Sequence, residues 1–280
     1  RPFIKVLNNF KDKFGGVVKA VFQPGEETSG GALPMIEEGV LENPHTDVCV
    51  ALHCDSDLDC VTIRVKPGSL YASPDDFRIT VKGKGGHGAE PHNCIDPIMI
   101  SASIIQALNN LISRETDPFD NAVISVGSIH GGSATNIIPD SVEIQGTARS
   151  LTNEVRGFLK KRIGETAEGI CKTFGAKCEY EYTELFPPLI NDEKLAEDVY
   201  DSACRSIGKD KCVWGGAPTM AGEDFSYFSQ NRPSVLFKLG CRNKSLGIVS
   251  LIHHSSFDID ENCLKTGVKV FVGFVLDYLN

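Results

Sequence analysis

Residues 73–185 carry a pattern of apolar residues that few folds can satisfy. The stretch DDFRITVKGK alternates apolar and polar residues, as a half-buried strand does. A helical repeat then follows Asp96 and Pro97, two strand-like stretches lie within residues 121–150, a second helical repeat begins near Thr152, and KCEYEYTE reads as a last strand. The order strand, helix, strand, strand, helix, strand is that of a ferredoxin-like domain. We therefore predict an α+β domain over residues 73–185.

The segments on either side of this domain predict an α/β pattern. A continuously apolar stretch at about residues 17–22, a helical stretch at 32–39 and a second apolar stretch at 47–53 indicate a β-α-β unit. Helix and strand alternate again from residue 186 to the last helix. We predict one domain built from residues 1–72 and 186–280, with a mostly parallel sheet flanked by helices, into which residues 73–185 are inserted.

Two adjacent glutamates, Glu26 and Glu27, follow the first apolar stretch in FQPGEETSGG. Neighbouring side chains at the end of a strand diverge, so one carboxylate can bind a cation while the other holds a water beside it. The alternative is a pair of solvated loop residues ahead of a helix. Ligands of parallel sheets bind beyond the carboxyl ends of the strands, where His53 also falls and to which the pair His253 and His254 returns.

Charge and cysteine content exclude several classes of protein. The formal net charge is −9, and no Lys/Arg cluster is interleaved with aromatic residues, which argues against a nucleic-acid partner. No apolar run is long enough to span a bilayer, and the first residues lack the apolar core of a signal peptide. The ten cysteines form no C-x-x-C pair and are predicted to be free thiols. We predict a cytoplasmic protein without a membrane partner.

Six motifs carry a resemblance to a known family, and they occur in order over nearly all of the chain: FQPGEETSGGALPMIEEGV, ALH, GKGGHGAEPH, GGSATNIIPD, AGEDFSYF and HHSSFDIDE. Together they resemble the metal-dependent aminoacylase/amidohydrolase family. It includes hippurate hydrolases, N-acyl-amino-acid amidohydrolases and auxin-conjugate hydrolases, and is related to glutamate carboxypeptidase. The resemblance implies an α/β metallopeptidase-like catalytic domain with an inserted lid through which a homodimer forms.

The resemblance also implies a chemistry and a set of residues. Two divalent metal ions, zinc or manganese first with nickel or cobalt as further candidates, would activate a water that cleaves the amide bond of an N-acyl amino acid or related small amide. By match, Glu26 is the general base, and Glu27, His53 and His254 are metal ligands. Ser256 stands where the family usually has proline, which affects backbone shape more than chemistry.

Four further residues are candidates by the same matches. His87 would stabilise the oxyanion from the lid of the neighbouring subunit, and its alternative is an exposed loop histidine. Asn136 would contact the carboxylate end of the substrate, or else be a turn residue. Arg149 and Glu223 are further substrate-binding candidates, whose alternatives are an exposed strand end and a carboxylate at the start of a helix. His45, His92 and His130 are read as solvated loop residues, and His253 as a neighbour that packs against or orients its partner.

One motif of the family does not occur in this chain. The family supplies its remaining metal ligands from a segment resembling H-x-C-G-H-D-x-H, which is absent here. The expectation is either that the sequence begins inside a longer protein or that it is a catalytically inactive, metal-free dimeric scaffold or fragment of such an enzyme. The presence of Glu26, Glu27, His53 and His254 favours the first, because a scaffold has no physical need for this set.

Overall fold

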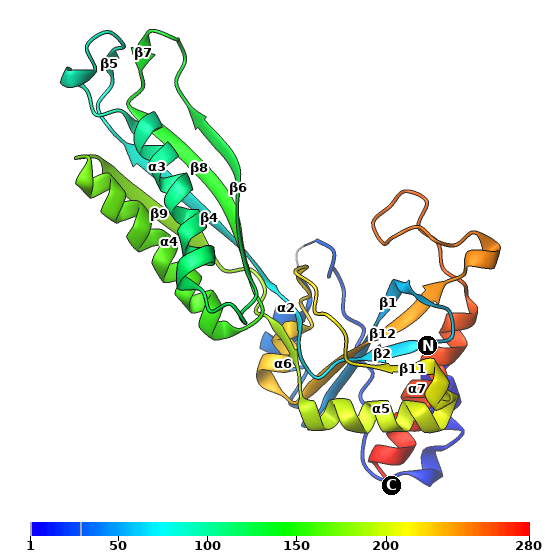
Figure 1. Ribbon diagram of the computed structural model, residues 1–280. Helices are drawn as coiled ribbons and strands as arrows, with labels where there is room; N and C mark the ends of the chain where they lie inside the picture. Colours follow the sequence, from blue (N-terminus) through cyan, green and yellow to red (C-terminus); the bar gives the residue numbers. More distant parts are fainter. Residues whose placement is uncertain (1, 29) are drawn as a thin grey trace. The chain divides into compact units, whose positions relative to one another are not determined.

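The computed structural model describes residues 2–28 and 30–280, which form two compact units (Figure 1). The first unit comprises residues 1–70, 189–218 and 224–280, and the second comprises residues 71–188 and 219–223. The predicted boundaries, after residues 72 and 185, lie two and three residues from those of the structure. Residues 219–223 were predicted to belong to the first domain, but they group with the second unit.

The second unit is a four-stranded antiparallel sheet in the order β6-β8-β4-β9, with two helices on one of its faces. Its main elements are β4 (Ser73–Lys82), α3 (Pro97–Asn110), β6 (Ala122–Gly131), β8 (Ser141–Ser150), α4 (Asn153–Thr173) and β9 (Lys177–Thr183). Two short strands, β5 (Gly86–His87) and β7 (Ile137–Ile138), pair with each other in a separate two-stranded sheet, and a π turn (Leu111–Glu115) follows α3. The predicted ferredoxin-like order is confirmed.

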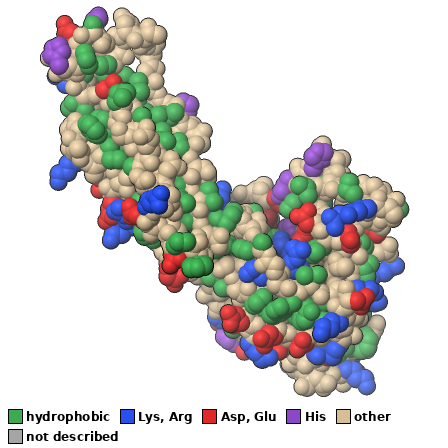
Figure 2. Space-filling view, viewed as in Figure 1, with side chains coloured by type: hydrophobic (Ala, Val, Ile, Leu, Met, Phe, Trp, Pro, Cys, Tyr) green, Lys and Arg blue, Asp and Glu red, His purple; other side chains and the backbone are tan. Residues whose placement is uncertain are grey.

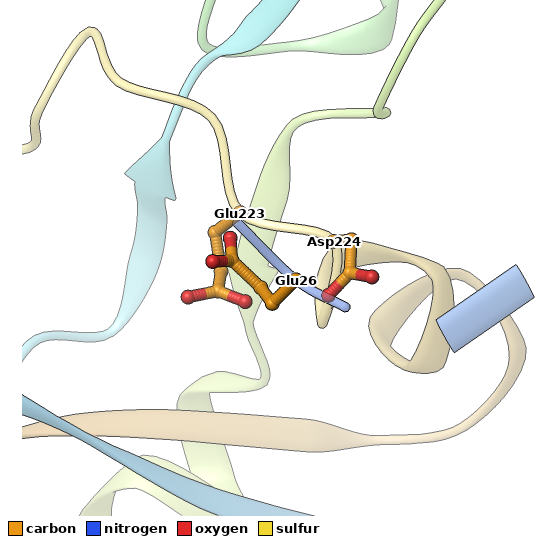
Figure 3. Close-up of side chains that lie close together, drawn as sticks. All are labelled: Glu26, Glu223 and Asp224. Atoms are coloured by element: carbon orange, nitrogen blue, oxygen red, sulfur yellow. The ribbon is translucent and has the colours of Figure 1, made fainter. Parts of the chain in front are cut away.

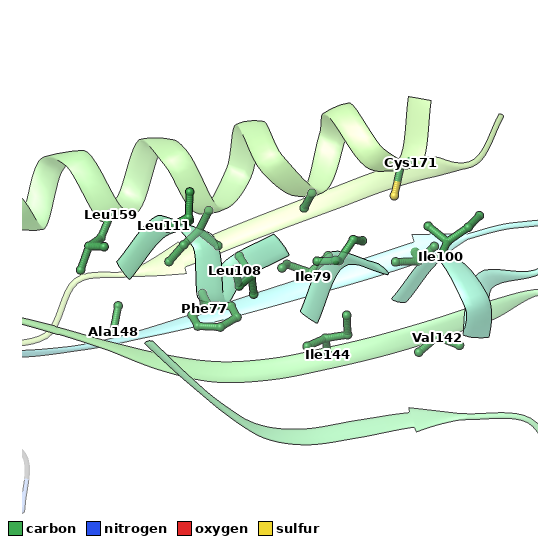
Figure 4. Packing of buried hydrophobic residues seen from close by; sticks show 14 of the residues in the cluster. Phe77, Ile79, Ile100, Leu108, Leu111, Val142, Ile144, Ala148, Leu159 and Cys171 are labelled. Atoms are coloured by element: carbon green, nitrogen blue, oxygen red, sulfur yellow. The ribbon is translucent and has the colours of Figure 1, made fainter. Parts of the chain in front are cut away.

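The sequence pattern explains how this unit packs. In β4, Phe77, Ile79 and Val81 are buried while the residues between them are more exposed, because alternate side chains point to opposite faces of a strand. The inward side chains meet those of α3 and α4, among them Ile104 and Leu159, which are both fully buried (Figure 4). The period of two in the strands and of 3.6 in the helices therefore produces one continuous core.

Polar caps fix where the two helices begin. The Asp96 carboxylate accepts hydrogen bonds from the backbone N–H groups of Ile98 and Met99, and Pro97 occupies the first helical position. The Thr152 hydroxyl accepts a hydrogen bond of 3.2 Å from the backbone N–H of Val155. Both helix starts agree with the prediction from the sequence.

The first unit contains a four-stranded mixed sheet in the order β1-β12-β2-β11. β1 and β12 run parallel, as do β2 and β11, whereas β12 and β2 are antiparallel. The strands are β1 (Cys49–Asp59), β2 (Ile63–Val65), β11 (Cys212–Trp214) and β12 (Ser234–Arg242), and a short pair joins β3 (Gly68–Tyr71) to β10 (Leu189–Asn191). The helices are α1 (Pro2–Asn8), α2 (Ala32–Glu37), α5 (Glu193–Ile207), α6 (Ser226–Asn231) and α7 (Asn262–Tyr278).

One face of this sheet is apolar and the other carries polar side chains. Leu52 of β1, Phe237 of β12 and Ile63 of β2 belong to the core that includes side chains of α5 and α7. The residues that alternate with them, His53, Lys238 and Arg64, point to the other face. That face therefore holds the polar side chains. His53 is the fifth of the eleven residues of β1, so the prediction that it falls at the carboxyl end of its strand is wrong.

The predicted strand at residues 17–22 is wrong, and with it the first strand of the predicted β-α-β unit. Residues 17–23 have no secondary structure assigned. They line a groove of about 450 Å³ whose other lining residues include Val48 and Val50 at the start of β1. A strand forms only when its N–H and C=O groups pair with a neighbour, and this stretch has no such ladder in the part of the chain that the structure describes.

Two further expectations concern membranes and disulfides. No helix within the described residues is long and apolar enough to cross a bilayer. All ten cysteines are free thiols, as predicted from their scattered spacing.

Candidate active site

The loop that carries Glu26 and Glu27 lies between the extended stretch 17–23 and α2. It closes on itself, because the N–H groups of Thr28 and Gly30 both donate to the carbonyl oxygen of Gly25, at 3.2 and 2.9 Å. Gly25 and Gly30 have positive φ angles, which glycine adopts without strain. Two adjacent carboxylates are thus presented on a tight turn, and the Glu27 side chain remains 65% exposed.

Glu26 has the electrostatic character of a general base. Partial burial raises the pKa of its carboxyl group, and the negative charges of Glu27 and Asp224 raise it further, against smaller lowering effects from the Asp224 backbone and His253. A carboxylate that binds a proton more readily than usual is better matched to proton transfer near neutral pH.

Asp224 and Glu223 approach Glu26 from the segment that precedes α6. They are consecutive residues, and each of the three carboxyl groups offers an oxygen within 4.8 Å of the others (Figure 3). Glu223 and Asp224 are both buried. The Asp224 oxygens already accept three hydrogen bonds, from the Gln23 side chain and from the backbone of Gly31 and Ala32.

His53 is oriented as a metal-binding histidine is. Its Nδ1 lies 2.6 Å from the carbonyl oxygen of Cys54, and a proton on Nδ1 would place the lone pair on Nε2, the atom that would bind a metal. Burial, and next the positive charge of Lys238, lower the pKa of His53, whereas Glu27 raises it. The ring is therefore kept in the neutral form that coordinates cations.

The two histidines of the HHSSF motif take different positions. His253 Nε2 lies 3.6 Å from a carboxylate oxygen of Glu27. Its φ angle is +65°, a backbone conformation that is uncommon for residues other than glycine. His254 Nδ1 instead lies 2.7 Å from the Ser256 hydroxyl and accepts a hydrogen bond of 3.2 Å from the Ser256 backbone N–H. In this arrangement His253 is the nearer partner of the acidic pair.

A row of basic side chains, which was not predicted from the sequence, crosses the same face of the sheet. In the strand register, His53 of β1 lies beside Lys238 of β12, which in turn lies beside Arg64 of β2. Burial lowers the pKa of Lys238 to about 8, although the charge of Asp55 opposes this. Arg64 Nη1 lies 3.8 Å from Asp55. A lysine in the otherwise apolar strand SVLFKLG was the available signal.

His87 and Asn136 come together at one end of the second unit. β5 pairs His87 with Ile137, and the N–H of Gly88 donates to the carbonyl oxygen of Asn136 at 2.8 Å. His87 and Asn136 are exposed, and Figure 2 shows histidine side chains gathered at this end, over β5 and β7. Any Cβ at Gly88 would lie 3.1 Å from the Asn136 carbonyl oxygen, so glycine allows the close approach.

Arg149 does not join this pair within the unit. It lies eight residues along β8 from Ser141, or about 26 Å at the usual rise of a strand. It pairs in register with Pro74 and Val123, and its guanidinium donates to the Thr147 hydroxyl. A role for Arg149 in binding substrate remains a prediction.

Two of the candidate ligands suit a divalent cation. Carboxylate and neutral imidazole are good ligands for zinc or manganese. Glu27 supplies a carboxylate, and His53 supplies an imidazole whose Nδ1 is paired with the Cys54 carbonyl oxygen and on which the charge of Glu27 acts. Glu27, His53 and His254 do not form one tight cluster among the described residues, where the grouped carboxylates are those of Glu26, Glu223 and Asp224.

Comparison with known proteins places these residues in a family. Residues 3–277 match the model of peptidase family M20/M25/M40. The chain is 37% identical over 273 residues to thermostable carboxypeptidase 2 of Saccharolobus solfataricus, a match that covers 96% of this chain and 68% of that protein. It is 37% identical over 260 residues to N-acetyldiaminopimelate deacetylase of Bacillus velezensis, covering 93% and 68% of the two chains.

A solved structure of the same family has a similar fold. The Bacillus subtilis YXEP protein, described as a dinuclear metal binding peptidase from the M20 family, superposes with a TM-score of 0.81 at 29% identity, over 99% of this chain and 69% of that one. The family resemblance stated from the sequence and the predicted fold class are therefore confirmed. This chain belongs to peptidase family M20/M25/M40, a family of hydrolases that includes carboxypeptidases, deacetylases and amidohydrolases.

Proposed function

We propose that this protein hydrolyses the amide bond of N-acyl amino acids or related small amides, with Glu26 as the general base. The observation that carries the proposal is the contrast between two adjacent carboxylates. Glu26 is partly buried with a raised pKa, whereas Glu27 is exposed and acts electrostatically on His53. The contrast suits one carboxylate that moves a proton and one that binds a cation.

Glu27, His53 and His254 would hold the metal, with His253 beside Glu27. Bound divalent ions supply a water of lowered pKa and polarise the carbonyl of the amide. The Glu26 carboxylate accepts the proton from the water as the water oxygen attacks the carbonyl carbon. Glu26 then delivers that proton to the nitrogen of the leaving amine as the C–N bond breaks.

The second unit would complete the site from a neighbouring subunit. His87 and Asn136 lie together on exposed backbone, where they are available to a second copy of the chain. His87 would donate to the oxyanion and Asn136 to the carboxylate end of the substrate, with Arg149 and Glu223 as further contacts. This requires a homodimer formed through the second unit.

What the named relatives have in common supports the proposed substrate class. A carboxypeptidase and an N-acetyl amino acid deacetylase both cleave a C–N amide bond adjacent to an amino acid. The acyl pocket differs among such enzymes, so the common amide rather than one acyl group defines the proposal.

The test is release of free amine from a panel of N-acetyl and N-benzoyl amino acids and dipeptides, with added zinc or manganese. We expect turnover that chelation abolishes and metal restores, and that is lost in Glu26→Gln. The matched control is Glu37→Gln, since Glu37 and Glu38 form a second adjacent acidic pair that is exposed at the end of α2. A folded dimer that holds no metal and releases no amine from any member of the panel, even with added zinc or manganese, would favour the inactive, metal-free scaffold instead.

A further inference from the structure

Asp224 is the most completely buried carboxylate near the acidic pair, and it contacts both ends of the loop that carries that pair. Its side chain has no solvent exposure. Oδ1 accepts a hydrogen bond of 2.5 Å from the Gln23 side-chain amide. Oδ2 accepts hydrogen bonds of 2.8 and 3.1 Å from the backbone N–H groups of Gly31 and Ala32. One carboxylate thus joins residue 23 to residues 31 and 32.

The loop is narrow at the point where Asp224 holds it. A Cβ on Gly31 would lie 1.9 Å from the carbonyl oxygen of Pro24, so the two ends of the loop are in direct contact there. Within the loop, hydrogen bonds to the carbonyl oxygen of Gly25 close the turn that presents Glu26. Because the loop is short and closed, a shift at its base is transmitted to the Glu26 carboxylate.

The hydrogen bonds of Asp224 also separate its role from that of a metal ligand. A carboxylate has about four lone-pair sites, and three of those on Asp224 accept bonds from the loop. Coordination of a cation would require Asp224 to release the loop. Its position therefore favours support of Glu26 over direct chemistry.

We propose that Asp224 is a positioning residue, whose carboxylate holds residue 23 to residues 31 and 32 at the base of the loop that carries Glu26, and thereby sets where Glu26 lies relative to the substrate carbonyl. The inference rests on the proposed function for its kinetic consequence. It adds a residue that the motif matches did not single out.

The test removes the acceptor oxygens of Asp224 and then supplies one again. Asp224→Ala removes all three hydrogen bonds to the loop. We expect kcat to fall about 10- to 100-fold with KM nearly unchanged, because small misplacement of a catalytic group costs this much. In Asp224→Asn, the side-chain oxygen can still accept from Gly31 and Ala32, and the Gln23 amide can turn to present its oxygen to the new side-chain N–H group, so kcat should recover to within about threefold of the wild type.

A matched control separates positioning from folding. Asp192 is an N-cap aspartate in the same unit and accepts a hydrogen bond of 2.8 Å from the backbone of Leu195 at the start of α5. Asp192→Ala should lower thermal stability, because it removes the N-cap of α5, without changing kcat, measured well below the melting temperature. Wild-type kcat in folded Asp224→Ala would overturn the proposal, as would an Asp224→Asn protein that keeps the loop hydrogen bonds but does not recover kcat.

A second readout does not depend on catalysis. Amide hydrogen exchange of Gly31 and Ala32 should accelerate in Asp224→Ala and return toward the wild-type rate in Asp224→Asn, with no change in Asp192→Ala. If the wild-type protein cleaves none of the amides, the proposed function fails. Unchanged exchange at Gly31 and Ala32 in Asp224→Ala would instead refute the role of Asp224 in holding the loop.

Discussion

At the scale of single residues, Glu26 and Glu27 show how neighbours in sequence acquire different chemistry. Their side chains are chemically identical, but Glu26 is partly buried beside Asp224, whereas Glu27 is exposed and lies beside His253. Burial and like charge stabilise the protonated form of Glu26. The environment, not the residue type, is therefore what distinguishes the proposed proton acceptor, Glu26, from the proposed cation ligand, Glu27.

This separation predicts opposite effects of two conservative substitutions. Glu26→Gln should lower kcat by roughly 100- to 10,000-fold, the range for a lost general base, and leave metal affinity largely intact. Glu27→Gln should weaken metal binding, because it removes a charged ligand. Isothermal titration with zinc or manganese, together with kinetics at saturating metal, distinguishes the two. Equal activity of both variants would contradict the assignment of roles.

Lys238 predicts a pH-dependent stability. Burial lowers its pKa in the folded protein from 10.5 to about 8, so at pH 7 folding must keep a buried ammonium charged. Lys238→Met should therefore raise the free energy of unfolding at pH 7 by about 1–3 kcal/mol. Between pH 8 and 10.5 the folded wild-type protein binds fewer protons than the unfolded one, so its stability rises with pH and the difference between the two proteins shrinks.

Urea denaturation at several pH values measures this effect. Lys244→Met is the control, because Lys244 is exposed. A difference between wild type and Lys238→Met that stays constant from pH 7 to 10.5 would show that Lys238 does not titrate in this range.

At the scale of elements, a buried ion pair joins β4 to α4 in the second unit. The Asp75 carboxylate has no solvent exposure and accepts two hydrogen bonds of 2.7 Å from the Arg156 guanidinium. It also accepts bonds from the Tyr182 hydroxyl at 2.9 Å and from the Leu185 backbone at 3.1 Å. One carboxylate therefore ties a strand, a helix and the segment after β9 together.

Removing one member of this pair should destabilise the second unit strongly. Arg156→Met leaves Asp75 buried without its counter-ion, and we expect a loss of about 3–5 kcal/mol in the free energy of unfolding. The control Lys160→Met removes the exposed pair of Lys160 and Glu184 and the cation–π contact of Lys160 with the Tyr182 ring at 5.9 Å, and should cost no more than about 2 kcal/mol. Hydrogen exchange of the β4 and β8 amides is the suitable measurement, because the single tryptophan, Trp214, lies in the first unit. Similar losses in the two variants would argue against a special role for the buried pair.

At the scale of the whole molecule, the proposed dimer predicts complementation between two inactive variants. In a mixture of His87→Ala and Glu26→Gln subunits, one of the two sites of each heterodimer combines an intact Glu26 with an intact His87. Random reassociation should restore up to about a quarter of wild-type activity. Native mass spectrometry establishes that heterodimers are present. No recovery in their presence would mean that His87 acts within its own chain or not at all.

Much of the fold could be predicted because its signals are local. The alternation in β4 and the repeats of α3 and α4 fix which side chains face inward, since strand and helix periods set the direction of each side chain. The Asp96 cap is equally local. The family was identified from short motifs, among them those around Glu26, His53 and His87, which are local in the sequence.

Other features depended on parts of the chain that are distant in sequence. Residues 17–22 have the composition of a strand, but strand formation requires a partner, and composition does not supply one. The row of His53, Lys238 and Arg64 exists only because β1, β12 and β2 align in register. The sequence pointed to Glu223 and not to Asp224. The burial of Asp224 and its hydrogen bonds to a loop some 200 residues away cannot be predicted from the local motif AGEDF.

The periodic elements, the ferredoxin-like order and the family could all be predicted from the chain alone. The spacing of apolar side chains indicates the elements, and the short motifs indicate the family. The tertiary structure alone decided which carboxylate is buried beside Glu26, which histidine approaches Glu27, and which basic side chains lie beside His53. The physical reason is that pKa values, hydrogen-bond partners and strand register are set by neighbours in space, and residues such as Glu26 and Asp224 become neighbours only when the chain folds.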